Sequence, residues 1–169
     1  MKVLITGGAG YFGTVLTEEI LDRFPYAKVI VYDNLMYKQD GLFSFFKYPK
    51  DRFEFVYGDV RDKDSLLEQL QKLDKNNDYV IPLAAIVGFP ACARDEKLAT
   101  AVNFEHVKYI VQSTKCRIIY PNTNSGYGVS DGDSYCTEET PLAPISVYGR
   151  TKCDAEEWVL GAGHTSLRL

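Results

Sequence analysis

The sequence predicts an α/β fold in which a doubly wound parallel sheet carries helices on both faces. Short apolar runs rich in β-branched residues alternate with longer amphipathic segments along the chain. A glycine-rich turn joins the first such run to the first amphipathic segment. Because strands that alternate with helices are joined by right-handed crossovers, the strands are expected to lie parallel. With 169 residues, the chain is long enough for one domain and too short for two ordinary ones.

The short apolar runs define the expected strands. They have the length and residue types of strands that are buried on both faces of a sheet. The expected strands cover residues 3–6, 29–32, 53–57, 79–83, 117–120 and 165–169, the last as a strand that is just beginning.

The amphipathic segments define the expected helices. Val15, Leu16 and Ile20 follow helical spacing, and Asp62 is suited to N-cap a second helix. The expected helices cover residues 11–23, 65–73, a stretch within 97–114, and 147–160.

Two segments do not fit this alternation. Residues 34–50 carry five aromatic side chains, and we interpret them as a short helix packed on the domain. Residues 122–144 contain turn-forming residues throughout and are expected to be a long loop. Connections of more than about 12–15 residues without structure of their own are uncommon and are often functional, so this loop is a candidate for part of a site.

Composition and charge argue against several classes of protein. The net charge is −4, and lysine and arginine are scattered, which does not favour a surface for nucleic acid or anionic membranes. No uncharged apolar run approaches the ~18 residues of a membrane span. The first residues lack the apolar region and cleavage site of a signal peptide, so we expect a cytoplasmic protein.

The cysteines and histidines do not predict a metal site. Cys92, Cys116, Cys136 and Cys153 are far apart and form no Cys-x-x-Cys pair, which favours free thiols in a reducing compartment. The two histidines do not supply closely spaced zinc ligands.

The turn after the first strand carries a dinucleotide-binding signature. Gly8, Gly10 and Gly13 form Gly-x-Gly-x-x-Gly, and Gly7, Gly10 and Gly13 form Gly-x-x-Gly-x-x-Gly. Glycines allow a tight turn and a close approach to a pyrophosphate, which the following helix N-terminus attracts. A glycine turn without a ligand is the alternative, but the preceding strand, the following helix and a downstream acid argue against it.

Two acidic residues extend this signature. Asp33 lies 20 residues after Gly13 at the end of the second strand, where a carboxylate accepts hydrogen bonds from ribose hydroxyls and repels a 2′-phosphate. NAD is therefore favoured over NADP. Asp59 follows the third strand and is suited to accept from the adenine amino group. The alternative for both acids is an ordinary turn residue. Together these motifs predict one Rossmann-like NAD-binding domain over residues 1–169.

Tyr148 and Lys152 form a candidate acid/base pair. They are four residues apart in an expected helix and therefore lie on one face. A free phenol has a pKa near ~10, and a nearby ammonium group favours the phenolate. Tyr-x-x-x-Lys is a weak pattern by itself, but it gains weight beside a dinucleotide-binding signature.

These motifs together resemble the extended short-chain dehydrogenase/reductase superfamily, and most closely its nucleotide-sugar epimerase/dehydratase branch, with UDP-galactose 4-epimerase-like features. The resemblance covers nearly the whole chain. It rests on residues 6–13, 33–35, 58–60, 83–85, Asn103, 123–128 and Tyr148-x-x-x-Lys152.

The resemblance implies roles for individual residues. Thr123, Tyr148 and Lys152 would be catalytic: Tyr148 as the acid/base, Lys152 as the group that lowers the Tyr148 pKa and binds the nicotinamide ribose, and Thr123 as a hydrogen-bond partner of the reacting sugar hydroxyl. The NAD-binding residues would be Gly7, Gly10, Tyr11, Phe12, Gly13, Asp33, Asn34, Asp59, Val60, Leu83, Ala84, Ala85, Tyr148 and Lys152.

The chain departs from the family pattern in three ways. Pro82 stands where the family often has histidine. Asn124 and Ser125 replace the Asp-Glu pair of the 4,6-dehydratases, and neither is a useful acid at neutral pH. A C-terminal region that supplies most nucleotide-sugar contacts is expected to be missing.

The expected function is that of an NAD-dependent nucleotide-sugar epimerase that acts through a transient keto sugar. A nucleotide-sugar 4,6-dehydratase or dehydrogenase is the alternative within enzymes, and a non-catalytic NAD-binding module or truncated inactive paralogue is the alternative outside them. The resemblance also implies a homodimer through the helices near 97–114 and 147–160.

Overall fold

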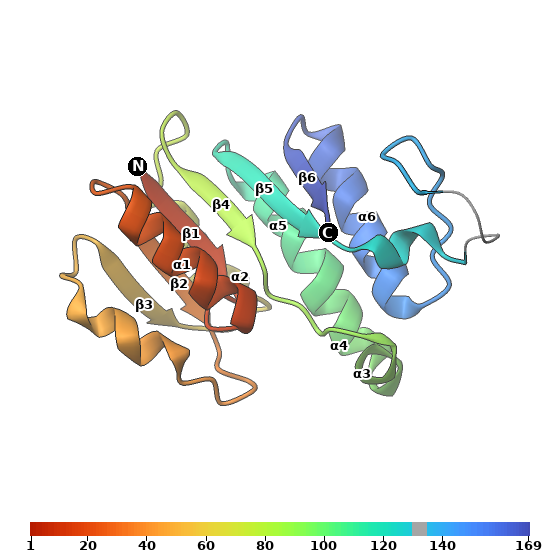
Figure 1. The fold of residues 1–169 in the computed structure, drawn as a ribbon, viewed down its shortest axis with the longest axis horizontal. Coiled ribbons are helices and arrows are strands. Elements are labelled where there is room, and N and C mark those ends of the chain that lie inside the picture. Colours follow the sequence, from red (N-terminus) through yellow and green to blue (C-terminus); the bar gives the residue numbers. More distant parts are fainter. Residues whose placement is uncertain (130–134) are drawn as a thin grey trace.

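The protein is built on a six-stranded sheet with the strand order β3-β2-β1-β4-β5-β6 (Figure 1). The computed structural model describes residues 1–129 and 135–169. All neighbouring strands run parallel, and the predicted fold class is confirmed. The strands are β1 (Lys2–Thr6), β2 (Lys28–Asp33), β3 (Phe53–Tyr57), β4 (Tyr79–Pro82), β5 (Arg117–Asn122) and β6 (Thr165–Arg168).

The centre of the sheet is β1, which pairs with β2 on one side and β4 on the other. Leu4 and Ile5 are neighbours in this strand, point to opposite faces and are both fully buried. They belong to two separate apolar clusters, one on each face of the sheet. A continuous apolar run is therefore what a central parallel strand requires.

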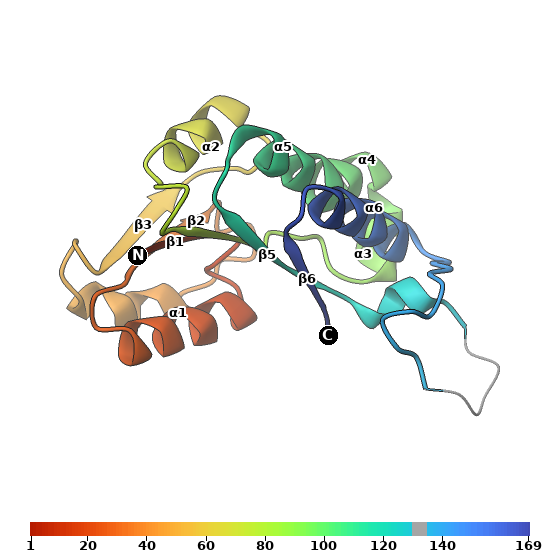
Figure 2. The ribbon, with the colours of Figure 1, turned by 90° about the horizontal axis from the view of Figure 1, so that it is seen from above.

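Helices cover both faces of the sheet (Figure 2). On one face lie α1 and the 3₁₀ helix η1, and on the other lie α2, α5 and α6. The helical segments are α1 (Tyr11–Arg23), η1 (Gly41–Lys47), α2 (Lys63–Leu70), α3 (Phe89–Arg94), α4 (Glu96–Thr100), the π-helical turn η2 (Ala101–Glu105), α5 (His106–Ser113), the 3₁₀ turn η3 (Asn124–Tyr127) and α6 (Val147–Gly161).

Two expected helices differ in detail. The second helix begins at Lys63 rather than 65, because the Asp62 side chain accepts from the Ser65 N–H at 3.1 Å and caps it there. The expected helix within 97–114 is divided by η2, which joins α4 to α5. The aromatic segment 34–50 contains η1, in agreement with its interpretation as a short packed helix.

The long connection 122–144 is not entirely irregular. Its first residue completes β5, which is two residues longer than expected, and η3 follows almost at once. Residues 130–134 of this expected loop lie outside the described residues. The helix α3 was not expected from the sequence.

The last strand is fixed to the sheet and to α6. β6 pairs with β5 from Ile119↔Thr165 onward. Arg168 forms an ion pair with Glu156 of α6 at 3.0 Å and donates to the hydroxyl of Tyr127 at 3.2 Å. One arginine therefore connects β6, α6 and η3.

Candidate functional site

A cleft of about 520 Å³ opens at the carboxyl ends of the central strands. It lies where the strand order changes direction between β1 and β4, the usual ligand position in open α/β sheets. Every residue predicted to bind the cofactor lines this cleft except Tyr148 and Lys152. The lining residues that sequence reasoning missed are Tyr32, Met36, Tyr37, Gln39, Gly58, Ile86, Val87 and Val102.

Two glycines shape the floor of the cleft by allowing close packing. Gly7 has φ +70°, and a Cβ there would lie 2.4 Å from the Ala84 nitrogen. A Cβ on Gly13 would lie 2.5 Å from the Gly8 Cα. These contacts are too short for any side chain. The β1–α1 turn can therefore approach α1 and the segment after β4 closely only because both positions are glycine.

The N-terminus of α1 faces the cleft without a cap. Gly10 is the N-cap residue and provides no side-chain acceptor. The amides of Tyr11, Phe12 and Gly13 donate to no acceptor in the described part of the chain. Free amides at the positive end of a 13-residue helix are suited to a pyrophosphate.

Asp33 ties the glycine-rich turn to the end of β2. Its Oδ2 accepts from the Ala9 N–H at 3.0 Å, and its Oδ1 accepts from the Leu35 N–H at 2.7 Å. Leu35 itself has φ +52°, and this hydrogen bond helps to hold it. Each carboxylate oxygen keeps capacity for a further donor such as a ribose hydroxyl. The sequence indicated the ligand role of Asp33 and not this supporting one.

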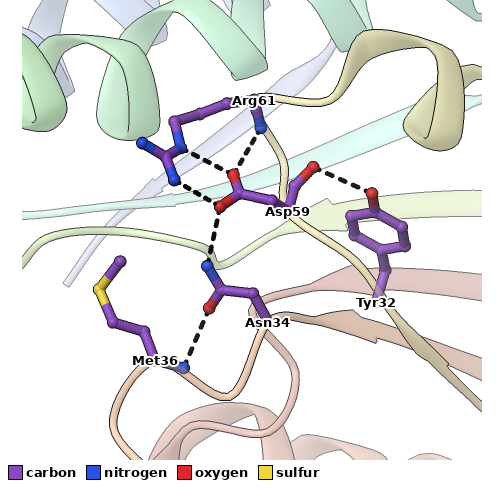
Figure 3. Close-up of polar contacts among 5 residues, drawn as sticks. All are labelled: Tyr32, Asn34, Met36, Asp59 and Arg61. Carbon is purple, nitrogen blue, oxygen red and sulfur yellow. Dashed lines mark hydrogen bonds and ion pairs between the residues drawn. The ribbon is translucent and has the colours of Figure 1, made fainter.

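Asp59 is the centre of a polar network at the other end of the cleft (Figure 3). Its Oδ1 accepts from the backbone N–H and Nε of Arg61, both at 2.9 Å. Its Oδ2 accepts from the Arg61 guanidinium at 2.7 Å and from Asn34 Nδ2 at 3.0 Å. Hydrogen bonds from Arg61 hold the pKa of Asp59 well below its usual range.

This network has a consequence for the adenine role expected of Asp59. Four donors already use the two carboxylate oxygens, so a base amino group would have to replace one of them. Asn34 is the only uncharged side-chain donor among the four, and its own Oδ1 accepts from the Met36 N–H at 3.0 Å. Sequence reasoning missed Arg61, although its two-residue spacing from Asp59 is a signal for such a pair.

The segment after β4 forms the opposite wall of the cleft. Leu83, Ala84 and Ala85 line it, and Ile86 follows. Asn103 of η2 fixes this wall through hydrogen bonds to Ile86 and also donates to Thr151 Oγ1 of α6 at 3.3 Å. The cleft wall and the helix that carries Tyr148 are therefore joined through one buried amide. Sequence reasoning noted Asn103 only as a family match.

Tyr148 stands on the first turn of α6. Ser146 caps this helix by accepting from the Gly149 N–H at 3.0 Å. Burial raises the pKa of the half-buried Tyr148, while the Thr123 hydroxyl acts in the opposite direction. Thr123 comes from the end of β5, so the fold brings together two predicted catalytic residues that are distant in sequence.

Lys152 lies one turn further along α6 and is 6% exposed. Its Nζ donates to the Pro121 carbonyl at 2.8 Å and lies 4.0 Å from the centre of the Tyr120 ring. Burial lowers the pKa of Lys152 to about 7. Burial raises the pKa of Tyr148 in this arrangement, and the expectation that Lys152 lowers that pKa stays a prediction.

Two classes of feature are absent from the described residues. Residues 1–129 and 135–169 contain no group of three or more histidine, cysteine, aspartate or glutamate side chains placed to hold a metal ion. Among the helices described, none is both long and apolar enough to cross a membrane.

Comparison with known protein families gives the wider context of this cleft. Residues 3–167 match the model of a family described as the NAD dependent epimerase/dehydratase family. The chain belongs to this family. The cofactor of the family is NAD, and the free amides at α1 together with the glycine-lined floor fit that dinucleotide.

Relatives of known sequence extend beyond the length of this chain. The Low-salt glycan biosynthesis protein Agl12 of Haloferax volcanii is 32% identical over 171 residues. That alignment covers 92% of this chain and 50% of the relative. This family member therefore spans about half the length of the curated relative it matches.

Solved structures show the same fold in enzymes of two kinds. DesIV, a dTDP-glucose 4,6-dehydratase from Streptomyces venezuelae solved with NAD and TYD bound, has a TM-score of 0.85 and 26% identity, covering 99% of this chain and 54% of its own. The UDP-Glc/GlcNAc 4-epimerase of Campylobacter jejuni has a TM-score of 0.86 and 24% identity, covering 99% and 52%. Both epimerases and dehydratases of the family therefore share this architecture.

Proposed function

We propose that this chain is the NAD-binding and proton-transferring domain of a nucleotide-sugar epimerase that acts through a transient keto sugar. The observation that carries the proposal is the uncapped N-terminus of α1, which faces a cleft lined by the predicted cofactor residues. Tyr148 and Ala84 pack against the same apolar cluster, which links the acid/base residue to the wall of this cleft.

Different residues of the cleft would bind different parts of the cofactor. The amides of Tyr11, Phe12 and Gly13 would hold the pyrophosphate, and Asp33 would accept from the adenosine ribose. Among the described residues that line the cleft there is no lysine or arginine, which favours NAD, whose ribose carries no 2′-phosphate. When bound, NAD supplies the carbon that takes up a hydride.

The chain itself handles the proton. As the phenolate, Tyr148 would take the proton of a sugar hydroxyl. The hydride would leave the carbon that bears this hydroxyl and pass to NAD, which gives a ketone. Tyr148 would return that proton when the hydride is returned to the other face of the sugar. Thr123 would hold the reacting oxygen. The ammonium of Lys152, one helical turn further along α6, would favour the phenolate.

An epimerase is proposed rather than a dehydratase because of two residues. Elimination of water needs an acid and a base beside the catalytic threonine, and Asn124 and Ser125 occupy those positions. The chemistry would therefore end with return of the hydride to an otherwise unchanged sugar.

Substrate, assembly and location are part of the same proposal. The substrate would be a nucleotide sugar, and a homodimer would form through α5 and α6. Trp158 of α6 is partly exposed beside Lys108 of α5, with Nζ 4.6 Å from the ring centre, and would lie in that interface. We propose a cytoplasmic location.

The proposal is tested first by calorimetric titration of the chain with NAD and with NADP. The key variant is Gly10→Ser. Gly10 has N-cap geometry, with φ −70° and ψ 174°, and its Cβ position meets only the Gly7 carbonyl oxygen at 3.4 Å. The serine hydroxyl would fit the fold, cap α1 and compete with the pyrophosphate for the same amides.

We expect Gly10→Ser to keep or raise the melting temperature of the protein and to lower its affinity for NAD at least about tenfold. Gly161→Ala is the matched control, because no atom lies within 4 Å of that Cβ position and it is far from the cleft. Equal NAD affinity in Gly10→Ser and Gly161→Ala would remove the observation on which the proposal rests.

The reaction is then tested with UDP- and GDP-sugars. Epimerisation without loss of water is the expected product pattern. Loss of water would identify a dehydratase. NAD binding without turnover of any sugar by a version of the protein that includes the substrate region would identify a non-catalytic module.

A further inference from the structure

The amine of Lys152 is held in a small buried site formed by consecutive residues of β5. Lys152 is 6% exposed and Tyr120 is 1% exposed, so both are almost entirely out of water. Nζ lies 4.0 Å from the centre of the Tyr120 ring and 2.8 Å from the Pro121 carbonyl oxygen. The ring face lies on one side of the ammonium, and the carbonyl accepts one of its three N–H donors.

We infer that Tyr120 is a positioning residue for Lys152, and that its ring face rather than its hydroxyl keeps the amine charged and in place. The inference rests on the proposed role of Lys152 beside Tyr148. Tyr120 would not touch substrate or cofactor and would act only through the lysine.

The Lys152 amine can be either charged or neutral near neutral pH, so one aromatic ring can change the ratio of the two forms. Burial lowers the pKa of Lys152 to about 7, so the neutral amine becomes accessible near neutral pH. A neutral amine gives Tyr148 no electrostatic help. Attraction between an ammonium and an aromatic face is strongest where both are desolvated, as they are here.

The other groups around Lys152 do not replace the ring. Glu156 and Cys153 lie on the same helix: Glu156 favours the charged amine, whereas burial raises the pKa of Cys153 and leaves its thiol uncharged at neutral pH. Glu156, however, is already paired with Arg168 at 3.0 Å. His106 of α5 also faces Lys152, but burial lowers the pKa of His106 to about 4, so it is uncharged at neutral pH. Tyr120 is the remaining group, from β5.

The hydroxyl of Tyr120 is not the functional part. Within the described residues it has no hydrogen-bond partner, although it is buried. Burial also raises the pKa of Tyr120 far above neutrality, so it does not exchange a proton at physiological pH. Removing an unpaired buried hydroxyl should cost little, because no hydrogen bond is lost.

The test compares Tyr120→Phe, which keeps the ring, with Tyr120→Leu, which removes it. The pKa of Lys152 is measured by NMR titration of a chain labelled at the lysine side chains, with Lys152→Met used to assign the signal. Phe45→Leu is the matched control, because Phe45 is a buried aromatic residue in the cluster on the opposite face of the sheet.

We expect the pKa of Lys152 in Tyr120→Phe and in Phe45→Leu to stay within about 0.3 of the parent value, and that in Tyr120→Leu to fall by about one unit, a tenfold change in the ratio of charged to neutral amine. An unchanged or raised value in Tyr120→Leu would overturn the inference, and so would an equal fall in Tyr120→Phe. If Tyr120→Leu does not fold, Tyr120→Met replaces it with the same expectations.

NAD titration of the same variants separates this inference from the proposed function. Failure of every variant and of the parent chain to bind NAD would reject the proposed function and leave the lysine measurement intact. Normal NAD binding with an unshifted lysine in Tyr120→Leu would reject only the role of Tyr120.

Discussion

The side-chain amide of Asn103 pairs with both backbone polar groups of Ile86, accepting from its N–H at 2.8 Å and donating to its carbonyl at 3.0 Å. Ile86 has left β4 at this point, so its backbone has lost the hydrogen bonds of the sheet. Asn103 replaces them from within η2. Single π-helical turns are frequently found at functional sites, and this one places a buried amide against the cleft wall.

Asn103→Ala should therefore destabilise the fold by about 3 kcal/mol, because it leaves two buried backbone groups unpaired and opens a cavity. The substitution should also weaken NAD binding, because Ile86 lines the cleft. Urea unfolding and calorimetry measure the two effects. Asn76→Ala is the control at an exposed turn and should change stability by less than about 0.5 kcal/mol. Equal stability of the two variants would contradict the role of Asn103.

The second prediction concerns the close approach of Gly7 to Ala84, just after β4. Gly7→Ala combines a left-handed backbone with a Cβ 2.4 Å from the Ala84 nitrogen, and should cost at least about 3 kcal/mol. Gly163→Ala has a similar φ of +79° with no atom within 4 Å, and should cost only about 1 kcal/mol. The difference between their free energies of unfolding measures the cost of the close contact with Ala84. Equal values would mean that the turn relaxes away from Ala84.

The third prediction is a pH dependence that arises at His106. Burial lowers the pKa of His106 from 6.5 to about 4. The unfolded chain therefore binds this proton more readily than the folded chain does, and stability falls as the pH drops from 6.5 toward 4. Between pH 7 and pH 5 this group should remove about 2 kcal/mol of stability.

His106→Phe should remove that part of the pH dependence, as measured by urea unfolding at pH 7 and pH 5. His164→Asn is the comparison variant: burial also lowers the pKa of this partly buried histidine, but its removal should leave the part of the pH dependence that arises at His106 in place. A parent chain and a His106→Phe variant that lose equal stability at pH 5 would show that His106 is charged or exposed in solution.

The fourth prediction separates binding from chemistry at Tyr148. Tyr148→Phe removes only the hydroxyl, so NAD should bind within about threefold of the parent. Turnover of a nucleotide sugar, in a form of the protein that includes the substrate region, should fall by at least about a hundredfold, because the proton has no acceptor. Tyr135→Phe is the control at a fully exposed tyrosine. Near-normal turnover by Tyr148→Phe would show that another residue is the acid/base.

Much of the fold could be predicted because local patterns agree with the global arrangement. Residues 3–5 are apolar without alternation, and β1 is buried on both faces. Asp62 has the side chain of an N-cap residue, and it caps α2. The π-helical turn at Asn103 could not be predicted, because it depends on hydrogen bonds to Ile86 and Thr151, which are distant in sequence.

The candidate site, like the fold, could be predicted only in part from the sequence. The sequence by itself determined the dinucleotide cleft, because glycine spacing, a helix N-terminus and an acid after the second strand are all set within one βαβ unit. Only the tertiary structure shows the surroundings of Tyr148 and Lys152. Their i, i+4 spacing places them on one helix face, but it does not predict that burial raises the pKa of Tyr148 or that the Lys152 amine lies against Tyr120 and Pro121. Desolvation depends on what packs above a helix, and helical spacing carries no information about that.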